Sequence, residues 1–153
     1  MRRDAQLIFT TGQSIAAAAA GSTILTDCVL IPQFKDPLTG LLTNDRPNVS
    51  GKMCWNGIVD GEDMAAAVNG SVVTFELYAD SDSTPTTGGT VIDTFTVTEN
   101  TASAHKDGTY LFCRPLPLGT FGPYLGVKVG IATQALSTGK VSSWIGPPLQ
   151  QGK

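Results

Sequence analysis

Between residues 124 and 132 the chain alternates between apolar and other side chains, and this pattern constrains the fold more than any other segment. Four branched apolar residues take one face of an extended chain: Leu125, Val127, Val129 and Ile131. The other face carries Tyr124, Gly126, Lys128 and Gly130. Because successive side chains of a β-strand point to opposite faces, this period of two predicts a half-buried strand that covers a core.

Similar alternation elsewhere predicts an all-β fold. Residues 71–79 place Val73, Phe75 and Leu77 inward, and residues 91–98 repeat the pattern, although Asp93 interrupts the apolar face. Further strands are expected at 109–114, 141–145, 6–9 and 23–31. Segments rich in Gly, Pro and Asp separate them and predict turns. Short, evenly spaced strands favour a β-sandwich or jelly roll, because two packed layers bury one face of each sheet.

Helix should be scarce, since only residues 13–20 and 62–68 are compatible with it. A chain of 153 residues is the usual size of one domain, and we expect a single domain over residues 1–153 with an amino-terminal arm over about 1–22.

Residues 32–56 differ from the rest of the chain. They combine several prolines and glycines with the apolar residues Leu41, Leu42 and Trp55. A structureless segment of this length is uncommon unless it is functional or ordered by contacts. The sequence therefore predicts a long irregular insertion loop, which either folds over its own core or forms an interface with another protein.

The charge balance argues against nucleic acid as a partner. The net charge is -3, from 10 basic and 13 acidic residues, and no basic run is present to neutralise phosphates. Only 15% of the residues are charged, against roughly 25% in average soluble domains. No stretch approaches the roughly 20 apolar residues that a bilayer span requires, so we expect a soluble protein without a membrane partner.

Catalytic chemistry has little support in the sequence, and we expect a protein that is not an enzyme. His105 is the only histidine, and it lies so close in sequence to Ser103 and Asp107 that a catalytic triad is not expected; a solvated loop histidine is. Glu62 and Asp63 are adjacent, so their carboxylates should point apart rather than work as a glycosidase pair.

No metal or other cofactor is expected. Asp80 and Asp82 offer oxygen ligands, but the sixth and twelfth places of an EF-hand loop hold Pro85 and Val91, so an Asx-type turn is expected there. The cysteines are widely spaced and predict free thiols rather than a disulfide framework or a zinc site: Cys28, Cys54 and Cys113.

Short motifs near both ends of the chain follow an order that is typical of one known protein family. The amino-terminal ones are Asp4-Ala5-Gln6-Leu7-Ile8-Phe9, Gly12-Gln13-Ser14-Ile15-Ala16-Ala17 and Ser22-Thr23-Ile24-Leu25-Thr26-Asp27. The carboxyl-terminal ones are Leu116-Pro117-Leu118, Tyr124-Leu125-Gly126-Val127 and Thr138-Gly139-Lys140-Val141. In this order they resemble the bacteriophage capsid cement (decoration) proteins of Bordetella-phage type. The chain departs from the family pattern at residues 32–56 and at Thr26-Asp27-Cys28.

The resemblance implies a jelly-roll virion protein that is made in the host cytoplasm and binds the outer surface of an HK97-type icosahedral shell. There it would clamp adjacent capsomers and stabilise the shell. Its implied partners are the major capsid protein and a second copy of itself, with a dimer favoured over a trimer. The expected contact residues are Leu7, Ile8, Phe9, Leu41, Leu42 and Trp55.

An alternative from a different functional class is a glycan-binding or receptor-binding head domain of a virion appendage. It would need an exposed aromatic platform, for which Trp55, Trp144 and Tyr110 are the candidates. Two tryptophans in a β protein are also typical core or interface anchors.

Overall fold

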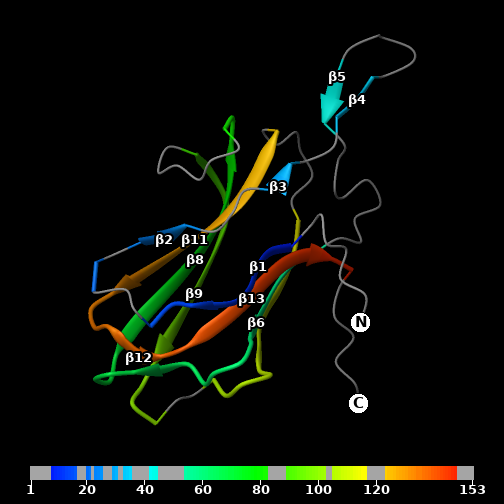
Figure 1. Cartoon of the computed structure of the whole chain (residues 1–153). Coiled ribbons are helices and arrows are strands. Elements are labelled where there is room, and N and C mark those ends of the chain that lie inside the picture. Colours follow the sequence, from blue (N-terminus) through cyan, green and yellow to red (C-terminus); the bar gives the residue numbers. More distant parts are fainter. Residues whose placement is uncertain are drawn as a thin grey trace.

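Two antiparallel β-sheets lie face to face and form a β-sandwich (Figure 1). The computed structural model describes residues 8–16, 20–21, 23–25, 29–30, 33–35, 42–44, 54–82, 89–102, 105–116 and 123–147. Sheet A has the order β1 (Ile8–Ser14), β13 (Lys140–Gly146), β6 (Cys54–Val59) and β10 (Tyr110–Pro115). The described ranges contain strands, turns and bends but no helix, which confirms the all-β prediction.

Sheet B is built around the strand with the strongest alternation. This strand, β11 (Tyr124–Ala132), pairs on one side with β2 (Thr23–Leu25) and β3 (Val29–Leu30). On its other side it pairs with β8 (Ser71–Asp80), and β9 (Thr90–Glu99) follows β8. Two small sheets complete the described structure, β7 (Ala65–Ala66) with β12 (Leu136–Thr138) and β4 (Gln33–Lys35) with β5 (Leu42–Asn44).

The core lies between the two sheets and is formed by the residues with period two. Sheet B contributes Val73, Phe75 and Leu77 of β8, and sheet A contributes Trp55 of β6 and Phe112 of β10. The ring centroids of Trp55 and Phe112 are 4.4 Å apart, and those of Phe75 and Phe112 are 5.4 Å apart. Burial of each such side chain stabilises the fold by roughly 1.5–3 kcal/mol, so this aromatic cluster holds the sheets together.

The outer face of β11 is less exposed than its polar pattern predicts. Lys128 is only 7% exposed, and its ammonium nitrogen lies 4.4 Å from the centroid of the Tyr78 ring, which has no exposed surface. A Cβ at Gly126 would lie 2.6 Å from the Tyr78 hydroxyl oxygen, so glycine makes room for this ring. The expected half-buried strand is therefore buried on both faces around Tyr78.

Several sequence predictions need correction. Residues 32–56 are not a wholly irregular loop, because they contain β4, β5 and the start of β6, an internal strand of sheet A. Residues 62–68 form no helix and contain β7 instead. The expected amino-terminal arm contains β1, whose residues pair with β13 as an edge strand of sheet A. The strand expected at 23–31 is divided into β2 and β3.

Candidate interaction surface

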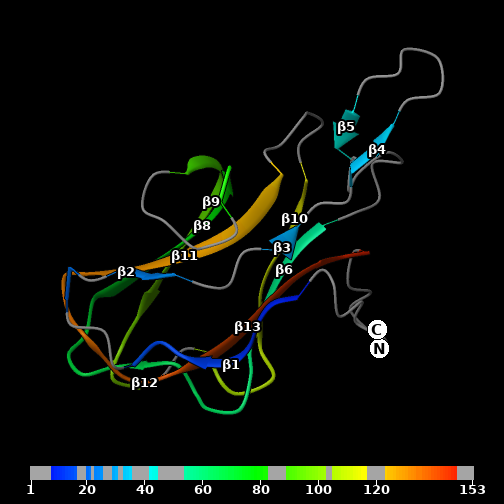
Figure 2. The same cartoon turned by 45° about the horizontal axis from the view of Figure 1, so that its top comes forward.

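The β4–β5 hairpin lies apart from both main sheets in two views (Figures 1 and 2). Its strands pair Gln33 with Asn44, Phe34 with Thr43 and Lys35 with Leu42. In sequence the hairpin lies between β3 of sheet B and β6 of sheet A, so it is part of the connection between the two sheets. A hairpin held away from the core is well placed to contact a second protein.

The structure separates the predicted contact residues into different environments. Leu7 and Leu41 lie outside the described residues, and Leu42 begins β5 in the hairpin. Ile8 begins β1, is half-buried and pairs with Trp144 of β13. The predicted contact residues are therefore not gathered in one place: Ile8 lies at the edge of sheet A, and Leu42 lies in the separate hairpin.

Phe9 and Trp55 are core residues rather than exposed contacts. Phe9 is 3% exposed and Trp55 is 0% exposed. The indole N–H of Trp55 donates to the Ser143 hydroxyl at 2.9 Å, and that hydroxyl donates to the Asn56 carbonyl at 3.0 Å. Because Trp55 is fully enclosed and its polar atom is satisfied within the chain, it has no surface to offer another protein.

Trp144 is also buried, so neither tryptophan provides the exposed platform that the glycan-binding alternative requires. Tyr110, 44% exposed, is the one aromatic residue among the exposed large apolar side chains of the described chain. A single tyrosine gives that alternative little support.

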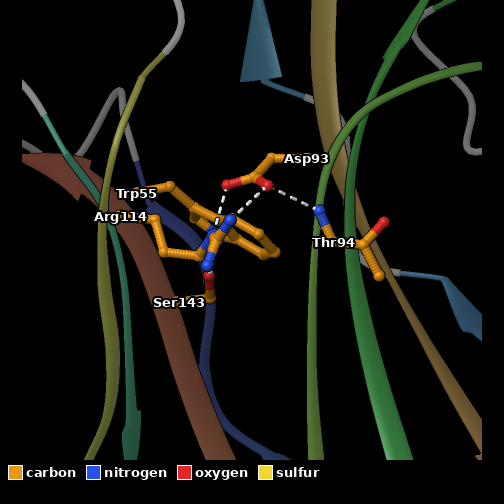
Figure 3. A network of polar contacts seen from close by, with 5 residues as sticks. All are labelled: Trp55, Asp93, Thr94, Arg114 and Ser143. Carbon is orange, nitrogen blue, oxygen red and sulfur yellow. Dashed lines mark hydrogen bonds and ion pairs between the residues drawn. The ribbon is translucent and has the colours of Figure 1, made fainter.

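An ion pair joins the two sheets beside β9 and β10 (Figure 3). The Arg114 guanidinium donates to both carboxylate oxygens of Asp93, with its Nε 2.5 Å from Oδ2 and an Nη 2.8 Å from Oδ1. The backbone N–H of Thr94 donates to the same carboxylate at 2.8 Å. The hydrogen bonds and opposite charge of Asp93 raise the pKa of Arg114 above its usual value, and this ion pair explains why an acidic residue interrupts the apolar face of β9.

His105 is not the solvated loop histidine that the sequence suggested. Its Nδ1 contacts the carboxylate of Glu99, which has no exposed surface, and its backbone forms a bridge with Met64. Asp107 points elsewhere, because its carboxylate accepts the N–H of Gly61 at 2.7 Å. The His105–Glu99 contact and the Asp107–Gly61 hydrogen bond therefore hold the turn at residues 106–109 against neighbouring parts of the chain. Asp107 does not orient the His105 ring as the acid of a catalytic triad would.

Asp63 also binds the turn at residues 106–109, and the stability that these contacts add should depend on pH. The backbone N–H of Asp107 donates to its carboxylate at 2.7 Å and the Lys106 ammonium at 3.0 Å, and these bonds hold the pKa of Asp63 below its usual value. A lowered folded-state pKa adds stability above the unfolded-state pKa, and this contribution is lost as the pH falls through the folded-state value.

Asp63→Asn should therefore destabilise the protein at pH 7, and its free energy of unfolding should approach that of the parent as the solution is acidified below the folded-state pKa. Urea unfolding of both proteins over this pH range measures the difference. Lys106→Met, which keeps the backbone hydrogen bond, should retain part of the pH dependence. A difference that stays constant with pH would contradict this account.

Two free cysteines lie near each other with different accessibilities. Cys54 of β6 is buried and Cys113 of β10 is exposed, whereas Cys28 lies outside the described residues. Burial, together with the neighbouring Cys113 thiol, raises the pKa of Cys54 to about 11. Because the thiolate is the reactive form, Cys54 should be inert in the folded protein at neutral pH.

In a Cys28→Ser background, we expect one thiol to react rapidly with a chromogenic aromatic disulfide and a second to react only after denaturation. Cys113→Ser should remove the rapid phase and Cys54→Ser should leave it, because only Cys113 is accessible. Absorbance of the released thiolate follows both phases. Equal native rates for the two cysteines would disprove the assignment.

The predicted Asx-type turn is confirmed, since the N–H of Asp82 donates to the Asp80 carboxylate at 3.2 Å. Within the described ranges, no three histidine, cysteine or acidic side chains gather as metal ligands. Nowhere in those ranges does a helix have the length and hydropathy that crossing a bilayer requires.

Comparison with known proteins adds no assignment: no family model matches the chain, and no curated protein matches it.

Proposed function

We propose that this protein is a bacteriophage capsid cement protein. It binds the outer surface of an assembled icosahedral shell, contacts the major capsid protein of adjacent capsomers and clamps them together. Its location is then the outside of the virion, and its fold is a jelly roll. The other functional class, a glycan-binding or receptor-binding head domain, has no aromatic platform from the two tryptophans, since both are buried.

The observation that carries this proposal is the pairing of the motifs that resemble the cement family. The segment around Ile8 pairs with the strand around Trp144, and Ser14 pairs with Lys140 of the closing motif. In sheet B, Ile24 of the third motif pairs with Val129, in the strand that the Tyr124 motif begins. Motifs far apart in sequence thus meet as neighbouring strands, as parts of one structural unit should.

The architecture suits a clamp. A β-sandwich with an interlocked aromatic core is stiff, and the β4–β5 hairpin lies apart from it as a separate contact element. Contacts from the sandwich and the hairpin to different capsomers would reinforce each other, since the first contact raises the effective concentration of the second. Binding that requires both capsomers in place stabilises the assembled shell by mass action.

Cosedimentation tests the proposal, using expanded shells that lack the protein. We expect saturable binding, a rise in the melting temperature of the shells and no binding to a sugar array. Leu41→Asp combined with Leu42→Asp should reduce shell binding at least about tenfold, because it places charge at the start of β5. A melting curve of the variant alone checks that it remains folded.

Ala67→Asp combined with Val68→Asp is the matched control, because both residues are exposed and lie outside the hairpin. This control should bind shells as the parent does. Equal loss of binding in the two double variants would show that the hairpin makes no specific contact, and failure of the parent to bind would overturn the proposed function.

A further inference from the structure

Strand β9 forms an open edge of sheet B. In the part of the chain that the structure describes, it pairs with β8 alone, from Ser71 opposite Glu99 to Ala79 opposite Thr90. Every second residue of an edge strand directs its N–H and C=O away from the sheet, and these groups can pair with another strand.

Among the outer strands of the two main sheets, β9 has the longest regular stretch, residues 93–99, and its inward-pointing acids, Asp93 and Glu99, stand only at the two ends of that stretch. β1 has register shifts on both sides of Thr10, and β10 has a shift after Tyr110 and ends at Pro115. The single shift in β9 is opposite Leu77 and Tyr78, so residues 93–99 are regular. This stretch contains neither lysine nor proline, the residues that commonly protect a sheet edge.

The regular part of β9 is symmetric in residue type about Thr96. Reading outward from Thr96, each direction gives an apolar residue, a threonine and an acid: Phe95, Thr94 and Asp93 on one side, and Val97, Thr98 and Glu99 on the other. A twofold axis through a pair of antiparallel strands places residue i opposite residue j and j opposite i. The segment is therefore complementary to a second copy of itself.

The apolar residues of this stretch are incompletely covered. Phe95 and Val97 are only half-buried, whereas their neighbours on β8, Phe75 and Val73, are 1% and 0% exposed. A strand added beside β9 would cover the remaining flank of both residues. The two acids at the ends already have partners within their own chain: Asp93 forms an ion pair with Arg114, and the Glu99 carboxylate contacts the His105 ring.

We propose that two copies of this protein associate through their β9 strands, which pair antiparallel about a twofold axis at Thr96 and extend sheet B across both molecules. Phe95 of one copy then faces Val97 of the other on the core side. Thr94, Thr96 and Thr98, which are exposed, form a threonine ladder on the outer side. Aromatic and β-branched cross-strand pairs of this kind are favourable. The inference does not rest on the proposed function.

Charge placed at the axis tests the proposal, because Thr96 would lie directly opposite its own copy. Thr96→Lys and Thr96→Glu should each raise the dissociation constant of the dimer by about tenfold or more, since like charges oppose each other. A mixture of the two variants should restore a dimer through a lysine facing a glutamate. Sedimentation velocity over a range of concentrations, without shells, measures all three samples.

Thr11→Lys is the matched control, because Thr11 is exposed on β1, an edge strand of the other sheet. It should dimerise as the parent does, and circular dichroism checks that all variants remain folded. A parent that stays monomeric up to about millimolar concentration would overturn the proposal. So would a Thr96→Lys variant that dimerises normally, or a mixture that remains monomeric.

Discussion

Replacing Trp55 with alanine should lower the free energy of unfolding by about 3–5 kcal/mol, the range expected when a large buried aromatic side chain is truncated. The indole has no exposed surface, packs against Phe112 at 4.4 Å and donates to Ser143. Alanine leaves a cavity between the sheets and removes the donor to the Ser143 hydroxyl. Urea unfolding followed by circular dichroism measures the loss.

Two further variants separate the causes. Trp55→Phe keeps an aromatic ring in the core but removes the indole N–H, so it should cost less than Trp55→Ala. Tyr110→Ala truncates an aromatic residue that is 44% exposed and should change stability by about 0.5 kcal/mol or less. If Trp55→Ala and Tyr110→Ala cost the same, Trp55 is not a core anchor.

Gly57→Ala should cost about 1–3 kcal/mol, although it adds only one methyl group. A Cβ at this position would lie 2.5 Å from two carbon atoms of the Phe112 ring. That ring is held by other aromatic residues, with centroid distances of 4.4 Å to Trp55, 5.4 Å to Phe75 and 4.9 Å to Phe95. Because it has little room to move, the added methyl group should strain the core. Chemical denaturation measures this cost.

Gly130→Ala is the matched control in a strand of the other sheet, because the nearest atom to its added Cβ would be 4.0 Å away. It should be close to neutral. Combining Gly57→Ala with Phe112→Leu should cost less than the sum of the two single changes, since the smaller side chain relieves the overlap. Additive costs, or an equal cost at Gly57 and Gly130, would contradict the packing described.

The strands that the sequence predicts well are those whose apolar residues recur without interruption. In β11 and β8 both ends of the strand agree closely with the pattern. β6 is missed for two reasons. It follows a segment rich in proline and glycine, and its alternation of apolar residues is broken at Gly57, which lies between Trp55 and Val59 on the same face of the strand. Only the structure shows that the Phe112 ring occupies that space.

Contact residues are harder to predict than strands, since a large aromatic side chain serves a core as well as an interface. Trp55 is such a case, and so is Phe9, which lies in the core of the sandwich. His105 is another difficulty, because its carboxylate partner Glu99 lies just beyond the strand predicted at 91–98 and nothing in the sequence marks it as a buried acid. The symmetry of residues 93–99 is visible in the sequence, but its meaning depends on the edge position of β9.

The most direct test of the central claim is a binding isotherm of the parent protein on purified expanded shells that lack it, with unassembled capsid subunits measured in parallel. A capsid clamp predicts saturable binding to the shells, at a fixed ratio of protein to capsomer, and no measurable binding to the free subunits. Equal affinity for subunits and shells, or no binding to either, would contradict the proposed function.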